Sequence, residues 1–143
     1  MRQPDSGDFS WLQLSATREN LPIFQEFVIN EAKRIKTSAE ILQKVELVLE
    51  ETLLNIICYA YPHNHEGSIQ LGCCLPGPGE LYIRIVDSGI AFDPLSRPDP
   101  DVGQPMQDRE VGGLGIHLVR RMADRVEYQR KDEMNILDIV FRT

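Results

Sequence analysis

A glutamate and an asparagine stand four residues apart in the stretch Glu51-Thr-Leu-Leu-Asn55. On a helix this spacing places both side chains on one face, one above the other. A carboxylate in that position can act as a general base, and a carboxamide oxygen is a ligand that Mg²⁺ accepts. A solvated polar stripe also explains the pair, because Glu46 and Glu50 give this segment an acidic side.

A second polar group follows an apolar run, in the stretch Asp87-Ser-Gly-Ile-Ala-Phe-Asp-Pro94. Asp87 ends a predicted strand, where a fixed carboxylate can accept a hydrogen bond from an exocyclic amine such as that of adenine. Gly89 allows a ligand to approach the backbone closely, and Phe92 and Pro94 can wall an apolar slot for a base. A simple turn has the same composition, so this stretch alone leaves both interpretations open.

Three glycines in the stretch Gly112-Gly-Leu-Gly-Ile116 stand where a helix is predicted to begin. Free backbone N–H groups at a helix N-terminus form an anion site that suits phosphates. The stretch lacks the Lys and Ser/Thr of a Walker loop and does not directly follow a strand, so neither a P-loop nor a Rossmann site fits.

Taken together, three stretches resemble the N, G1 and G2 boxes of the GHKL (Bergerat-fold) ATP-binding family, in the family's order. They read EETLLNIICYAY, DSGIAFDP and GGLGIHLVRRMADRVEY. The short chain, the FDP after the G1 glycine and the LVRRMADRVEY tail most resemble the RsbW-like branch of anti-sigma-factor serine/threonine kinases. No helix pair with a phosphoacceptor histidine precedes the boxes, unlike in a complete sensor kinase.

This resemblance implies a role for each matching residue. Asn55 would hold Mg²⁺ and Glu51 would activate the attacking hydroxyl. Asp87 would bind the adenine amine of ATP. The other residues expected to contact the nucleotide are Gly89, Ala91, Phe92, Gly112, Gly113, Leu114, Gly115 and Ile116.

Residues 95–111 would form the ATP lid, in which Arg97 and Arg109 could reach the γ-phosphate or a partner. Tyr59 stands where many relatives have histidine.

The resemblance also implies a function. It indicates an anti-sigma factor and ATP-dependent protein serine kinase that phosphorylates a STAS-domain anti-anti-sigma partner and switches between that protein and a sigma factor or another regulated protein. Dimers occur in this family, so a homodimer is one possible state. Two alternatives stay open: a nucleotide-gated module that sequesters its partner without phosphoryl transfer, and an ATP hydrolase like those of the gyrase branch.

The elements that must position these residues follow from periodicity and from capping signals. Asn20 is predicted to cap a helix that runs to about Lys36, with Pro22 in its first turn. Thr37 and Glu40 have the spacing of a capping box, which predicts that the longest helix runs from there to about Tyr61. Strands are predicted at residues 9–15, 68–75, 81–87, 125–130 and 135–141, and a third helix begins at the glycine cluster. We therefore expect an α+β two-layer sandwich, with helices covering one face of a mainly antiparallel sheet.

Composition fits one soluble domain. The chain has 143 residues, 42% of them hydrophobic and 26% charged. We expect a flexible tail over residues 1–8 and a single domain over residues 9–143. The net charge of −7 argues against nucleic-acid binding, and the absence of a signal peptide or a spanning apolar run predicts a cytoplasmic protein without a membrane segment.

Two groups of residues that could bind a metal have simpler explanations. Cys73 and Cys74 lie in an apolar alternating run, which predicts small buried side chains. His63, His65 and Glu66 follow the long helix beside Pro62, and two histidines make an incomplete metal site.

Overall fold

The structure is a computed structural model, which describes residue 4 and residues 8–61, 67–91, 93 and 113–143. Its five strands form one antiparallel sheet in the order β1-β2-β3-β5-β4. The strands are β1 (Ser10–Ser15), β2 (Ser68–Cys74), β3 (Glu80–Asp87), β4 (Arg125–Lys131) and β5 (Met134–Arg142). The helices are α1 (Leu21–Lys33), α2 (Ala39–Asn55) and α3 (Gly113–Met122), with a short 3₁₀ turn η2 (Arg18–Asn20) and a π-helical segment η3 (Ile56–Ala60).

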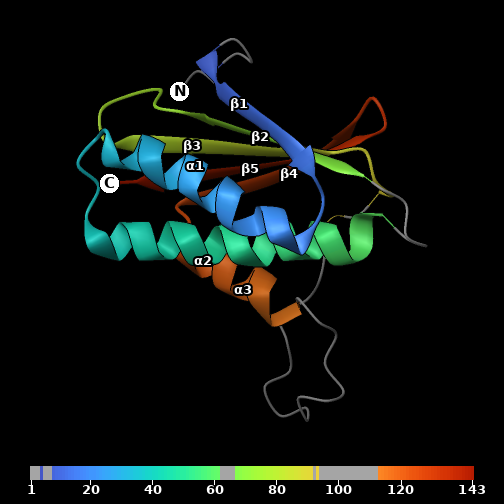
Figure 1. The fold of residues 1–143 in the computed structure, drawn as a ribbon. Helices are drawn as coiled ribbons and strands as arrows, with labels where there is room; N and C mark the ends of the chain where they lie inside the picture. Colours follow the sequence, from blue (N-terminus) through green and yellow to red (C-terminus); the bar gives the residue numbers. More distant parts are fainter. Residues whose placement is uncertain (1–3, 5–7, 62–66, 92, 94–112) are drawn as a thin grey trace.

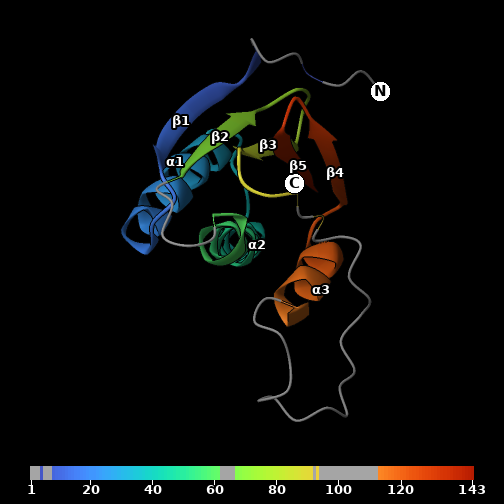
Figure 2. The same ribbon diagram turned by 90° about the vertical axis from the view of Figure 1, so that its right-hand side faces the viewer.

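All three α-helices lie on one face of the sheet. Figures 1 and 2 show them side by side, with α2 between α1 and α3. This arrangement confirms the predicted α+β sandwich. The predicted strands are all present, with ends that differ by at most one residue.

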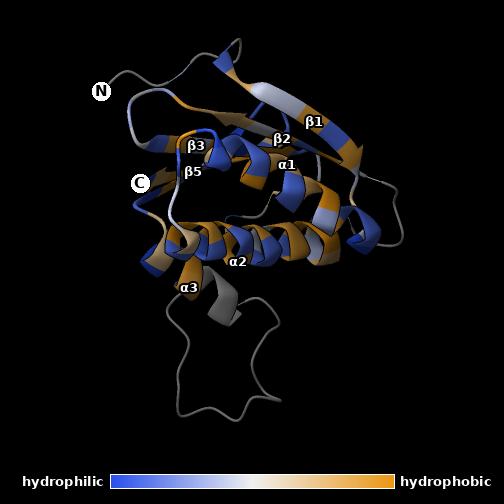
Figure 3. Cartoon of the chain, turned by 60° about the vertical axis from the view of Figure 1, so that its left-hand side comes forward, coloured by the Kyte–Doolittle hydropathy of each residue, from blue (hydrophilic) through white to orange (hydrophobic). Residues whose placement is uncertain are grey.

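The core lies between the sheet and the helices. Alternate residues of β3, namely Leu81, Ile83 and Ile85, are buried there, as the two-residue period of a strand requires. Figure 3 shows hydrophobic and hydrophilic residues sharing α1 and α2, as expected for helices with one buried side. Five residues of α2 at three- and four-residue spacing are buried against the core: Val45, Val48, Leu49, Thr52 and Leu53.

The start of α2 differs from the prediction by one residue. Ser38, not Thr37, is the N-cap, and its hydroxyl oxygen accepts a hydrogen bond from the Ile41 N–H at 3.3 Å. The Thr37 hydroxyl instead donates to the Ala32 carbonyl oxygen at 2.6 Å. The predicted capping box is therefore wrong, because Thr37 is used to close the C-terminal end of the preceding helix.

The two ends of α1 also depart from the prediction. Asn20 is the N-cap residue of α1, as predicted, but its amide donates to the Ser15 carbonyl oxygen at 2.9 Å and makes no cap bond. At the other end, α1 stops at Lys33 rather than Lys36. Lys36 has a left-handed backbone (φ 54°), which cannot continue a right-handed helix.

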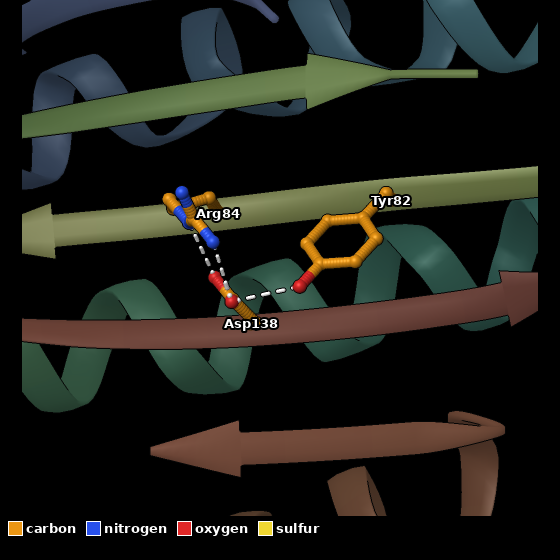
Figure 4. Close-up of polar contacts among 3 residues, drawn as sticks. All are labelled: Tyr82, Arg84 and Asp138. Carbon is orange, nitrogen blue, oxygen red and sulfur yellow. Dashed lines mark hydrogen bonds and ion pairs between the residues drawn. The ribbon is translucent and has the colours of Figure 1, made fainter. Parts of the chain in front are cut away.

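The face of the sheet opposite the helices carries a buried ionic cluster. Arg84 on β3 and Asp138 on β5 are paired in register, and their side chains form two hydrogen bonds of 2.8 and 2.9 Å. Tyr82 donates its hydroxyl hydrogen to Asp138 Oδ2 at 2.8 Å (Figure 4). These contacts join the neighbouring strands β3 and β5 on the face opposite the three α-helices.

Candidate functional site

The C-terminal half of α2 presents the two polar residues singled out by their spacing. Asn55 is the last residue of this helix and is only 6% exposed. Among the described residues, its Nδ2 atom is a buried donor with no hydrogen-bond partner. An unpaired buried donor costs about 1–3 kcal/mol, so an acceptor atom from a bound molecule or a water would stabilise this amide.

Glu51 lies one turn before Asn55 and is half-buried. Burial raises the pKa of its carboxyl group, and the neighbouring charge of Glu50 raises it further. A carboxylate whose pKa is raised toward neutrality is better suited to accept a proton than an ordinary surface glutamate. The solvated-stripe interpretation fits Glu50, which is exposed, better than it fits Glu51.

The helix does not continue as an α-helix to Tyr61. After Asn55 the chain widens into the π-helical segment η3, which ends at Ala60. The Ala60 carbonyl oxygen accepts a hydrogen bond of 2.9 Å from the Ile90 N–H. Single π-helical turns inside helices occur frequently at functional sites. Here the turn joins the end of α2 directly to the chain that leaves β3.

Tyr61 strengthens the same junction. Its hydroxyl donates to the Ser68 carbonyl oxygen at 2.6 Å and accepts from the Ser88 N–H at 2.9 Å. Its ring occupies the space that a side chain at Gly67 would need. One side chain therefore links the end of η3 to the start of β2 and to the residue after Asp87.

Asp87 is the last residue of β3 and is 4% exposed. Its Oδ1 atom accepts hydrogen bonds of 2.9 Å from the Gly89 N–H and from Asn135 Nδ2. Burial raises the pKa of this carboxyl group, while these two hydrogen bonds and the positive charge of Arg130 act in the opposite direction. The structure thus keeps a hydrogen-bonded carboxylate inside the protein, and such buried acidic groups often mark functional sites.

Packing against η3, rather than the approach of a ligand, explains why residue 89 is a glycine. A Cβ atom here would overlap the Ala60 carbonyl oxygen and lie 2.6 Å from the Ala60 Cβ. The absence of a side chain lets residues 87–90, here called the Asp87 turn, pack directly against η3. The close packing at Gly89 therefore fixes the distance between Asp87 and the end of α2.

Three polar residues of β4 and β5 support this turn, and none of them was predicted from the sequence to belong to the site. Asn135 contacts Asp87 and Ile90, Tyr128 donates its hydroxyl hydrogen to Asn135 Oδ1 at 2.6 Å, and Arg130 donates to the Gly89 carbonyl oxygen at 2.8 Å. One signal could have found Asn135: it is the polar member of an otherwise apolar alternation, Asn135-Leu137-Ile139-Phe141.

The glycine stretch falls at the start of a helix, as predicted. Gly113 is the first residue of α3, and Leu114, Gly115 and Ile116 complete its first turn. This helix contacts α2 (Figure 1). Ala91 is exposed beyond the Asp87 turn. Five further predictions concern residues outside the described part of the chain: Phe92, Gly112, the lid at residues 95–111 with Arg97 and Arg109, the histidines His63 and His65, and most of the tail.

Other binding chemistry is not apparent in the described residues. No group of three or more His, Cys, Asp or Glu residues there could hold a metal ion. Cys73 and Cys74 are buried, as predicted, and burial raises the pKa of the Cys74 thiol to about 11. Across the same ranges, no helix combines the length and apolar character needed to span a bilayer.

Comparison with known proteins identifies the family. The model of the histidine kinase-like ATPase domain matches residues 14–141, so the chain belongs to this family. The serine/threonine-protein kinase BtrW of Bordetella bronchiseptica is 29% identical over 128 residues, which cover 90% of this chain and 89% of the relative. The serine-protein kinase RsbW of Listeria monocytogenes is 24% identical over 130 residues, covering 88% and 82%.

A solved structure supports the fold independently. The histidine kinase domain of the blue-light activated histidine kinase EL346 of Erythrobacter litoralis superposes with a TM-score of 0.52 and 17% identity. The match covers 85% of this chain and 60% of the kinase chain, so the protein spans about three fifths of that structure. The predicted GHKL resemblance is confirmed.

Proposed function

We propose that this protein is an ATP- and Mg²⁺-dependent protein serine kinase and anti-sigma factor. It phosphorylates a STAS-domain anti-anti-sigma partner in a cytoplasmic partner-switching pathway. Membership of the ATPase family supports ATP as the nucleotide, and the relatives named as serine kinases support a protein acceptor. The observation that carries the proposal is the buried amide of Asn55, whose Nδ2 has no partner among the described residues, one turn after a half-buried glutamate with a raised pKa.

The residues fit a bound magnesium nucleotide. Asn55 would offer its carboxamide oxygen to Mg²⁺, which would neutralise charge on the phosphate oxygens. Asp87 would accept a hydrogen bond from the adenine amine. The backbone N–H groups at the start of α3, from Gly113 to Gly115, would bind the phosphates. The packing of Gly89 on Ala60 would keep the base and the metal at a defined separation.

The transfer itself requires little beyond positioning and one base. Glu51 would take the proton of the partner's serine hydroxyl as the hydroxyl oxygen bonds to the γ-phosphorus. The bond between that phosphorus and the β–γ bridging oxygen breaks, and ADP leaves with the electron pair. The products are phosphoserine, ADP and a protonated Glu51, which then loses its proton to water.

Two neighbouring glutamates provide a matched test. Glu51→Gln should abolish label transfer from γ-labelled ATP to a STAS-domain partner while leaving ATP binding intact. Glu50→Gln, which changes the exposed neighbour, should transfer label at neutral pH as the unaltered protein does. If the Glu51→Gln variant transfers label as fast as the unaltered protein, Glu51 is not the general base.

The same experiment separates the alternatives. Partner binding that depends on ATP, without label on the partner from the unaltered protein, would indicate a nucleotide-gated module. Phosphate release without any protein acceptor would indicate a hydrolase. Label on a serine of the partner supports the kinase.

A further inference from the structure

Asn135 is a polar residue on the inward, apolar side of β5. The other inward residues of this strand, Leu137, Ile139 and Phe141, belong to the hydrophobic core. Asn135 is only 5% exposed. Because a buried amide is costly unless it is hydrogen-bonded, its contacts explain why it is tolerated there.

The hydrogen bonds of Asn135 converge on the Asp87 turn. Asn135 lies directly opposite Asp87 in the β3–β5 register. Its Nδ2 donates to Asp87 Oδ1 at 2.9 Å and to the Ile90 carbonyl oxygen at 2.8 Å. Its Oδ1 accepts from the Tyr128 hydroxyl at 2.6 Å. Both partners of Nδ2 can only accept, so the amide orientation follows from the chemistry of its neighbours.

These contacts determine which oxygen of Asp87 faces a ligand. Both hydrogen bonds that described residues donate to this carboxylate end on Oδ1. Within the same part of the chain, none is donated to Oδ2. A carboxylate held at one oxygen by two donors cannot rotate freely, so Oδ2 keeps one direction.

Among the described residues, two titratable side chains interact with Asp87. They are Arg130 on β4 and Tyr61 in the segment after η3. Burial raises the pKa of Asp87, and the Asn135 hydrogen bond is the largest influence in the opposite direction. Loss of Asn135 therefore raises the pKa of Asp87 further.

We propose that Asn135 is a positioning residue for the nucleobase, which holds Asp87 Oδ1 so that Oδ2 is presented to the adenine amine. Tyr128 in turn holds the amide of Asn135 from β4. The inference rests on the proposed ATP site and adds to it a control of base recognition by the neighbouring strand β5 and the edge strand β4.

The test is ATP binding by Asn135→Leu, measured by titration calorimetry between about pH 5 and pH 8. Leucine has a similar volume but cannot donate to Asp87. We expect roughly tenfold weaker binding at neutral pH, in line with the loss of a hydrogen bond to a charged group. Because the ionised carboxylate is the better acceptor, affinity falls as pH decreases, and this fall begins at higher pH in the variant.

Two tyrosines supply a matched pair that disturbs the protein less. Tyr128→Phe removes the hydroxyl that holds Asn135, and Tyr82→Phe removes a comparable buried hydroxyl on the opposite face of the sheet. We expect a several-fold loss of ATP affinity in the first variant and none in the second. This pair decides the question if Asn135→Leu does not fold.

The outcomes are distinguishable. Weaker, more pH-sensitive ATP binding in the folded Asn135→Leu variant supports the inference. An unchanged affinity and pH profile overturns it, as does an equal effect of the two tyrosine substitutions. Failure of the unaltered protein to bind ATP would instead overturn the proposed function, and the inference with it.

Discussion

Replacement of Gly89 by alanine should disrupt the junction between the Asp87 turn and η3. The added Cβ would overlap the Ala60 carbonyl oxygen and stand 2.6 Å from the Ala60 Cβ, well inside van der Waals contact. The neighbour is largely backbone, so no flexible side chain can move aside. The turn must shift, and the hydrogen bond from the Ile90 N–H to Ala60 at 2.9 Å is strained or broken.

The expected cost follows from overpacking at a rigid contact. Such substitutions destabilise proteins by about 1–3 kcal/mol. In a chain of this length each kcal/mol lowers the melting temperature by roughly 4 °C, so we expect a decrease of about 4–12 °C. Because Asp87 moves with the turn, ATP binding should weaken as well.

A second glycine provides the control for this experiment. A Cβ on Gly77 would meet only Glu80 Oε2 at 3.7 Å, an ordinary contact. Thermal unfolding followed by circular dichroism should show Gly77→Ala within about 2 °C of the unaltered protein. Equal melting temperatures for Gly89→Ala and Gly77→Ala would refute the packing argument.

Further predictions concern charges and thiols. Asp138→Ala leaves a largely buried arginine unpaired and should lower the free energy of unfolding by about 3 kcal/mol in urea denaturation, whereas Glu127→Ala, which breaks an exposed pair, should cost less than about 1 kcal/mol. Comparable costs would contradict this. Glu50→Gln removes a charge that raises the pKa of Glu51, so Glu51 stays ionised to lower pH and the acidic limb of the kinase pH profile should move to lower pH; a shift to higher pH would contradict the assignment. A thiol reagent should modify the folded protein only at Cys58, the exposed cysteine, and rapid labelling of all three would contradict the buried positions of the others.

The fold was largely accessible from the sequence because its elements carry strong periodicity. The three- and four-residue spacing over α2 and the apolar, β-branched content of β3 and β5 lead to the observed sandwich. The capping prediction failed for a local reason, since Thr37 and Ser38 are adjacent and either can cap a helix. Ser38 is the cap because the Thr37 hydroxyl is already hydrogen-bonded to the Ala32 carbonyl oxygen in the preceding helix.

The sequence predicted the candidate site only where its residues are close together along the chain. Glu51 and Asn55 share a helix face, and Asp87 closes a strand. Asn135 stands far along the chain from Asp87, and its role depends on the pairing of β3 with β5, which periodicity does not specify. The π-helical turn after Asn55 depends likewise on contacts with the Asp87 turn.

Calorimetric titration with ATP and Mg²⁺, on the unaltered protein and on Asp87→Asn, tests the central claim most directly. The asparagine oxygen can still accept hydrogen bonds from the Gly89 N–H and Asn135 Nδ2. Its NH₂ group replaces the second acceptor, Oδ2, by a donor, and the substitution removes a charge that burial disfavours. The variant should therefore be at least as stable as the unaltered protein at neutral pH, yet bind ATP more than about tenfold more weakly. A flat titration of the unaltered protein, or equal affinity in the two, would contradict an adenine nucleotide site at Asp87.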